Sequence, residues 1–249
     1  MKEIILDKLA EIEKCENVKI LHCVESGSRA WGFASPDSDF DVRFVYVRQK
    51  EFYLRLDKTR DVIEWQLDDT LDINGWDIQK TLTLLHNSNP TVFEWSSSPI
   101  VYKTTPEWQR ISSVFHRYFS VKSELYHYLN AAKSNFNGQL TGETVKLKKY
   151  FYVLRPLLAC KWILEKGTPP PMLFSSLMQE HLDCEIRPDV ERLLEMKMNN
   201  PEISHAERID RIDAYLRRNM AEIEAVIANL PNDKTTEWEE LNSLFLSLL

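Results

Sequence analysis

The feature that most constrains the fold is a pair of aspartates, Asp39 and Asp41, at the start of the apolar run 42–47. Strand side chains alternate between two faces, so two carboxylates two residues apart project to the same side. A polar turn explains Asp37, but Asp41 adjoins the apolar run, where an unpaired buried charge is costly. The spacing therefore predicts an extended segment whose two carboxylates face one cation.

A glycine-containing turn separates this pair from an earlier apolar run, 18–24. Gly27 permits backbone conformations that are closed to other residues, so the turn can present backbone N–H groups, with the Ser28 hydroxyl, to a phosphate. The aspartates supply the hard oxygen ligands that Mg²⁺ prefers when it is shared between protein and substrate phosphates. An anion-binding turn and a cation site are therefore expected one loop apart.

The string G-S-R-A-x-G-x(5)-S-D-x-D-V-R-F, which begins at Gly27, resembles the signature of the DNA polymerase β-type nucleotidyltransferase superfamily, a Gly-Ser pair followed by Asp-x-Asp. In this form it is most similar to the predicted nucleotidyltransferases of that superfamily associated with RNA repair. The resemblance implies transfer of a nucleoside monophosphate from an NTP, such as ATP, to a hydroxyl, with Mg²⁺ (or Mn²⁺) as cofactor. RNA is the acceptor that the family implies; a protein side chain or a small molecule fits the same chemistry.

A third acid is expected, because two carboxylates rarely hold both ions of a two-metal site, which lie about 3.5 to 4 Å apart. The superfamily pattern places this acid on a neighbouring strand. Asp72, in the predicted strand 71–77, is the first candidate for a catalytic metal ligand with Asp39 and Asp41. Asp77 is the second, although a carboxylate at a helix start also serves as an N-terminal cap. Two further acids remain as alternatives: Glu64 and Asp69.

Basic residues near the acids are candidates for binding the nucleotide's phosphates. Arg29 lies in the turn and can clamp a triphosphate oxygen or pair with Glu25. Arg43 can orient a carboxylate, contact substrate or form a structural ion pair. Lys80 belongs to the string W-D-x-x-K-x(8)-N-P-T-x-x-E-W, which resembles the segment after the third acid in the repair-associated family and implies a phosphate contact.

A second basic stretch occupies residues 146–156, where Lys148, Tyr152 and Arg155 follow the spacing of one helix face. A solvated face explains many such runs, but this one also carries aromatic side chains. In polymerase β-type enzymes the helical domain after the catalytic sheet supplies base and triphosphate contacts. The similar placement and composition imply nucleotide binding by Lys149 or Lys148 and by Arg155.

The hydrophobic pattern changes near residue 105. Before this point it predicts a helix over 2–14 and alternating strands and helices up to residue 102. After it, helical patterns cover most of the chain, at 107–137, 143–166, 172–182, 187–198, 204–229 and 235–248. The predicted class is therefore α+β, with an N-terminal nucleotidyltransferase-type mixed sheet and flanking helices in a catalytic domain (1–105), followed by an all-helical C-terminal domain (106–249).

Composition narrows the class of protein further. The 249 residues carry a formal net charge of −7, which disfavours general coating of nucleic acid, so an RNA acceptor needs a local basic patch. Four scattered cysteines and the absence of a signal-like or membrane-spanning apolar run predict a cytoplasmic protein that does not enter a membrane. A non-catalytic nucleotide-binding or regulatory, antitoxin-like protein is the alternative, and the retained acids argue against it.

Overall fold

A mixed sheet forms the first part of the chain. The computed structural model describes residues 1–57, 59–68, 70–200 and 205–249. Within these ranges the main sheet has the strand order β3-β4-β2-β1-β5. Its parallel pair, β2 with β4, lies at the centre, and the other neighbours are antiparallel. The strands are β1 (Val18–Glu25), β2 (Phe40–Arg48), β3 (Val62–Asp68), β4 (Leu71–Asp77) and β5 (Val101–Thr104).

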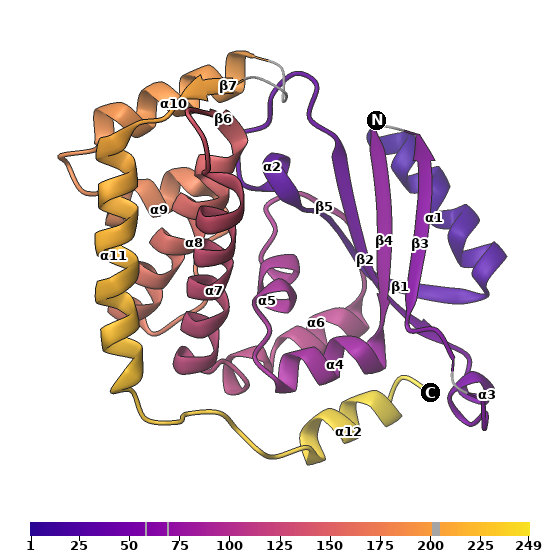
Figure 1. Cartoon of the computed structure of the whole chain (residues 1–249). Helices are drawn as coiled ribbons and strands as arrows, with labels where there is room; N and C mark the ends of the chain where they lie inside the picture. The colour runs from indigo at the N-terminus through magenta and orange to yellow at the C-terminus, as the bar shows by residue number, and fades with distance from the viewer. Residues whose placement is uncertain (58, 69, 201–204) are drawn as a thin grey trace. The chain divides into compact units, whose positions relative to one another are not determined.

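Helix α1 (Lys2–Glu16) covers one face of this sheet (Figure 1). Its buried positions Ile5, Leu9 and Ile12 follow helical spacing and form one apolar stripe. The stripe packs on strand side chains that point to the same face, including Phe44 and Ile73. The helix ends at a left-handed Asn17, as helix C-termini often do.

The other face of the sheet is covered by three short helices, α4 (Ile78–His86), α5 (Pro90–Ser96) and α6 (Pro106–Ser112) (Figure 1). Aromatic contacts attach them: Trp76 of β4 lies 4.0 Å from Trp95 of α5 between ring centroids, and His22 of β1 stacks on Trp108 of α6. Each helix begins at a side-chain cap, and α5 and α6 carry proline in the first turn. Further helices of this region are α3 (Lys50–Tyr53), η1 (Phe115–Arg117) and α12 (Glu239–Leu246).

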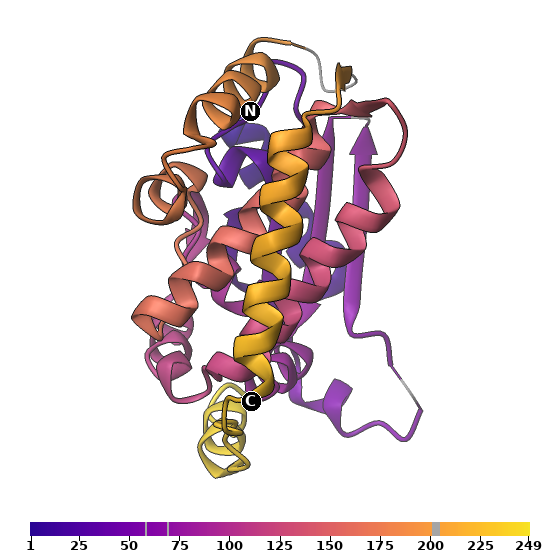
Figure 2. The same cartoon turned by 60° about the vertical axis from the view of Figure 1, so that its left-hand side comes forward.

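The rest of the described chain is mainly helical, as predicted. In Figure 2 the long α11 runs beside α7 and α8, which pack on each other. The predicted pattern at 107–137 is divided into α6, η1 and α7, because the Ser120 side chain caps a new helix start. A two-stranded ladder of β6 (Thr144–Lys146) and β7 (His205–Glu207) was not predicted. The helices are α7 (Val121–Gln139), α8 (Leu147–Lys166), α9 (Phe174–His181), α10 (Arg187–Asn199) and α11 (Asp210–Ala228).

The chain forms two compact units, each made of separated segments. The sheet unit comprises residues 1–27, 39–118 and 235–249, and the helical unit comprises 28–38 and 119–234. The loop between the Gly-Ser turn and the aspartate pair therefore belongs by its contacts to the helical unit. The predicted domain boundary between residues 105 and 106 stays a prediction. In the described part of the chain, every helix is too short or too polar to cross a membrane.

Candidate functional site

The paired acids lie side by side on the central parallel strands. Asp41 of β2 and Asp72 of β4 are direct partners in the register. Arg43, two residues further along β2, donates from one guanidinium nitrogen to Asp41 Oδ1 at 2.9 Å and to Asp72 Oδ2 at 2.7 Å. Alternation puts all three side chains on the same face of the sheet. The carboxylates that share a cation here are those of Asp41 and Asp72, and the cation is a guanidinium. The predicted cation site of Asp39 and Asp41 stays a prediction.

The chemistry and exposure of Asp41 and Asp72 suit a metal ion. Carboxylate oxygens are the ligands that Mg²⁺ and Mn²⁺ take, and those of Asp41 and Asp72 already converge on one cationic atom. The two side chains are 32% and 52% exposed, so a cation can reach them from solvent. In the described ranges no group of three or more His, Cys, Asp and Glu side chains is placed to hold a metal ion. The acids therefore fit a cation chemically, and in this geometry Arg43 takes that place.

Gly27 adjoins the Asp41 carboxylate directly. It opens the one-turn helix α2 (Gly27–Ala30) in a left-handed conformation, φ +59°. A Cβ at this position would lie 2.1 Å from Asp41 Oδ2, which is far inside van der Waals contact. The Ser26 backbone N–H donates to the Asp41 carbonyl at 2.8 Å. Gly27 and the aspartate strand therefore lie in direct contact, and only glycine fits at this position.

A buried carboxylate holds the backbone of the aspartate strand. Glu25, at the end of β1, is fully buried and accepts the Asp41 backbone N–H at 2.8 Å. Its other oxygen accepts the Tyr102 hydroxyl of β5, and its backbone carbonyl accepts the Ser98 hydroxyl. Sequence reasoning treated Glu25 only as a partner for Arg29. The signal that could have identified it is a charged residue closing an apolar strand.

The other acids are placed differently. Asp39 is exposed and lies just before β2, two residues before Asp41 in the sequence. Asp77 is 3% exposed and caps α4, accepting the Gln79 N–H at 2.7 Å. Because Asp77 lies five residues beyond Asp72, alternation turns it to the opposite face of β4. Glu64 of β3 pairs with an arginine, and Asp69 lies outside the described residues.

Burial gives Asp77 an unusual titration. Desolvation raises its pKa from an ordinary 3.8 to about 6. Between these pH values the folded protein binds more protons at Asp77 than the unfolded chain does. The contribution of Asp77 to the free energy of unfolding therefore falls as the pH rises from 4 to 6 and stays constant above pH 6.

Asp77→Asn keeps a capping oxygen but cannot ionise. The variant should therefore gain stability relative to wild type across pH 4 to 6, by roughly 1 to 3 kcal/mol. Urea unfolding at four pH values measures the difference. Asp7→Asn, which removes an exposed carboxylate of α1, is the control and should run parallel to wild type. If the free energy of unfolding of Asp77→Asn changed with pH in the same way as that of wild type, the prediction would be contradicted.

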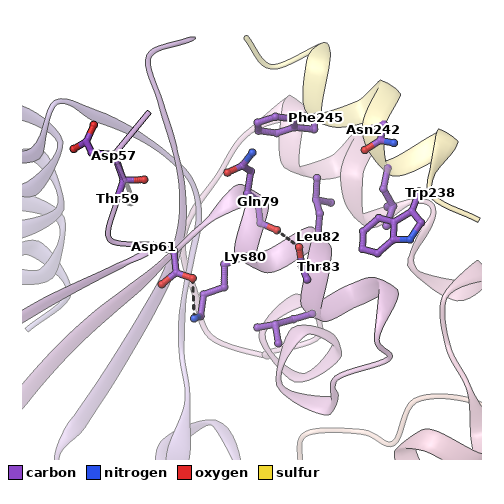
Figure 3. A pocket seen from close by; sticks show the side chains of 12 residues that line it. Asp57, Thr59, Asp61, Gln79, Lys80, Leu82, Thr83, Trp238, Asn242 and Phe245 are labelled. Carbon is purple, nitrogen blue, oxygen red and sulfur yellow. Dashed lines mark hydrogen bonds and ion pairs between the residues drawn. The ribbon is translucent and has the colours of Figure 1, made fainter. Parts of the chain in front are cut away.

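Lys80 lies away from the paired acids, at the opposite end of β4. Its ammonium pairs with Asp61 at 3.2 Å, and both line a cavity of about 720 Å³ between α4, α12 and the chain before β3 (Figure 3). Trp238, just before α12, forms part of the wall and stacks on His86 with ring centroids 3.6 Å apart. The predicted phosphate contact of Lys80 stays a prediction, and the structure does not bring Lys80 to Asp72.

Two predicted arginines make packing contacts inside the helical unit. Arg29 donates to the Ser38 carbonyl at 2.6 Å, across the loop that both residues belong to. Arg155 of α8 is 3% exposed and lies over the Trp31 ring at 4.7 Å. Such burial leaves little of the Arg155 guanidinium for a phosphate. Nucleotide contacts by both residues remain predictions.

Lys149 is placed more openly. It lies over the Tyr152 ring at 5.0 Å, and Tyr152 meets Trp31 edge-on at 6.0 Å. Burial, with Lys148 and Lys146 nearby, lowers the pKa of Lys149. These half-buried aromatic and basic side chains form one array within the helical unit. Aromatic rings of this kind can stack on a nucleotide base, and a lysine ammonium beside them can bind a phosphate.

A buried lysine anchors the loop between the Gly-Ser turn and the aspartates. Lys197 of α10 is 2% exposed and donates to the Ser35 hydroxyl at 2.9 Å. The Ser35 and Ser38 hydroxyls lie 2.9 Å apart, and Phe33 packs into the core of the helical unit. The Lys197 contact was not predicted, because it joins residues 162 positions apart.

Comparison with known proteins agrees with the resemblance seen in the motifs. Residues 1–247 match the family described as RlaP, RNA repair pathway DNA polymerase beta family. The chain is 45% identical over 251 residues to the uncharacterized protein YcgL of Bacillus subtilis (strain 168), covering 99% of this chain and 96% of that protein. A crystal structure of a nucleotidyltransferase-like protein from Exiguobacterium sibiricum 255-15 aligns with 84% of this chain and 69% of its own, at 14% identity and a TM-score of 0.27. The chain belongs to the RNA repair pathway DNA polymerase beta family.

Proposed function

We propose that this protein is a Mg²⁺-dependent (or Mn²⁺-dependent) nucleotidyltransferase that moves a nucleoside monophosphate from an NTP to a hydroxyl acceptor by a two-metal mechanism, with RNA as the first acceptor to test. The single observation that carries the proposal is the convergence of Asp41 and Asp72 on one cationic atom beside Gly27. Family membership supports the reaction class. The four cysteines are unbridged, which is in keeping with a cytoplasmic enzyme.

The residues of the sheet unit have distinct tasks in this proposal. Asp39, Asp41 and Asp72 would hold the metal ions. When bound, the ions neutralise charge on the attacking and leaving oxygens of the transferred phosphoryl group. Gly27 leaves room for the Asp41 carboxylate, and Glu25 fixes the backbone from which that carboxylate projects.

The nucleotide's phosphates and base would be bound by polar and aromatic groups. Ser28 and Arg29 of α2 are assigned to the phosphates, as are Lys80, Lys149 and Arg155. Lys149 has the strongest support, because it lies half-buried beside an aromatic ring. Arg155 and Lys80 have the weakest support, because the Arg155 guanidinium is covered and Lys80 lies at the other end of β4 from the paired acids.

The test is transfer of label from α-labelled NTPs to short RNAs with Mg²⁺ or Mn²⁺, together with pyrophosphate release. Asp39→Asn combined with Asp41→Asn should lower the rate by about 1,000-fold or more, because transition-state charge loses its neutralisation. Asp7→Asn, which removes one exposed carboxylate of α1, is the control and should keep the wild-type rate. A wild-type protein that releases no pyrophosphate with any acceptor would defeat the proposal and favour a non-catalytic nucleotide-binding role.

Metal-dependent NTP binding, measured on single variants, separates the two candidates for the third acid. Asp72→Asn should remove metal-dependent NTP binding, because Asp72 is the register partner of Asp41. Asp77→Asn should leave most of it, because Asp77 points to the other face and caps α4. The reverse result would transfer the assignment to Asp77.

A further inference from the structure

We propose that Arg43 is a built-in counter-cation that a divalent metal ion must displace from Asp41 and Asp72. The inference rests on the proposed function for its metal-binding acids. It adds a role for a side chain that offers no ligand oxygen of its own.

The Arg43 guanidinium forms four hydrogen bonds to the two central strands. One terminal nitrogen binds both carboxylates, at 2.9 and 2.7 Å, and the other binds the Val42 and Asp72 carbonyls at 3.1 and 3.0 Å. The Arg43 side chain is 18% exposed, whereas the acids are 32% and 52% exposed. The guanidinium therefore lies beneath the carboxylates and is held on both strands.

The strand register explains why a cation is needed there. Asp41 and Asp72 are direct neighbours on adjacent strands, and like charges in such positions repel. A guanidinium stays charged at every physiological pH, so it balances the pair permanently. It supports the strand pairing for as long as no other cation is bound.

A metal ion and this guanidinium compete for the same oxygens. Mg²⁺ binds carboxylate oxygens at about 2.0 to 2.1 Å, so an ion shared by Asp41 and Asp72 would lie within a few ångströms of Arg43. Two cations at that distance repel strongly in a partly buried site. Arg43 therefore has to leave at least one carboxylate when the ion binds, and the cost lowers the metal affinity of the free protein.

The test is Mn²⁺ binding to the full chain, measured by the electron paramagnetic resonance signal of free Mn²⁺. Arg43→Ala and Arg43→Gln should each bind Mn²⁺ at least about tenfold more tightly than wild type, because the competing charge is gone. Arg55→Ala is the charge-matched control: Arg55 forms an ion pair with Asp57, its neighbour on an exposed loop of the same unit. It should bind within about twofold of wild type.

The outcomes are distinguishable from those of the proposed function. If wild type binds Mn²⁺ and both Arg43 variants bind it no more tightly, Arg43 positions the acids instead, and the inference is overturned while the proposed function stands. If no variant binds Mn²⁺, both are overturned. Should Arg43→Ala fail to fold, Arg43→Gln keeps part of the stem and a donor for the strand carbonyls. The Arg43 Nε–H signal in a ¹⁵N spectrum of wild type should also shift when Mg²⁺ is added.

Discussion

Gly27→Ala is expected to slow the proposed nucleotidyl transfer strongly and to leave the protein folded. The new Cβ would lie 2.1 Å from Asp41 Oδ2 and 2.9 Å from its Cγ, so the two cannot coexist. The carboxylate is the end of a short rotatable side chain and can turn away. The acid then no longer faces its partner, Asp72. We expect a loss of about 100-fold or more in rate, comparable to misplacing a catalytic group by an ångström.

The stability cost of this substitution should be small. Gly27 has φ +59°, and an alanine held there costs about 1 to 2 kcal/mol. Gly167→Ala is the matched control, because Gly167 has φ +63° and a Cβ added there would meet nothing within 4 Å. Both variants should unfold at similar urea concentrations, but only Gly27→Ala should lose label transfer and Mn²⁺ binding. Equal activity in the two variants would show that the close contact with Asp41 is irrelevant to the site.

The apolar run after the aspartates was sufficient to predict the strand that carries Asp41 and Arg43, because that inference uses only the two-residue period of β structure. Asp39 lies just before this strand, so the face that it shares with Asp41 stays a prediction. The choice between Asp72 and Asp77 was different. It depends on the register of β4 against β2, and no local pattern encodes which residue pairs with Asp41. Once the register is known, alternation places Asp72 on the face of Asp41 and Asp77 on the other.

The basic residues were harder to place for a related reason. Helical spacing correctly put Lys149 and Arg155 on α8. It did not reveal that Trp31, more than a hundred residues earlier, covers the Arg155 guanidinium. The contacts of Lys197 with Ser35, and of Glu25 with Tyr102, likewise join distant segments. Whether a charged side chain is buried depends on the assembled unit. Periodicity therefore predicts the helix that carries the side chain but not the residues that contact it.

Gly75→Ala should produce the opposite result, a large loss of stability. Gly75 of β4 is the register partner of Phe44 in β2, and a Cβ there would lie 2.1 Å from the Phe44 ring. Phe44 is fully buried in the core beneath α1. A ring in that setting has no free direction in which to move, so the overpacking should cost about 3 kcal/mol. Thermal and urea unfolding of the full chain measure this loss of stability.

Two further variants identify the cause. Gly138→Ala, on α7 with nothing within 4 Å of the added carbon, should be neutral or stabilising by up to about 1 kcal/mol. Phe44→Leu should cost stability in wild type, because it leaves a cavity, and should cost less or even restore stability beside Gly75→Ala. Additive losses in the double variant would contradict a clash with the ring. Gly27 and Gly75 thus lack side chains for different reasons. The first makes room for a movable carboxylate that the proposed reaction needs, and the second makes room for a fixed ring that packs between the two acid-bearing strands and α1.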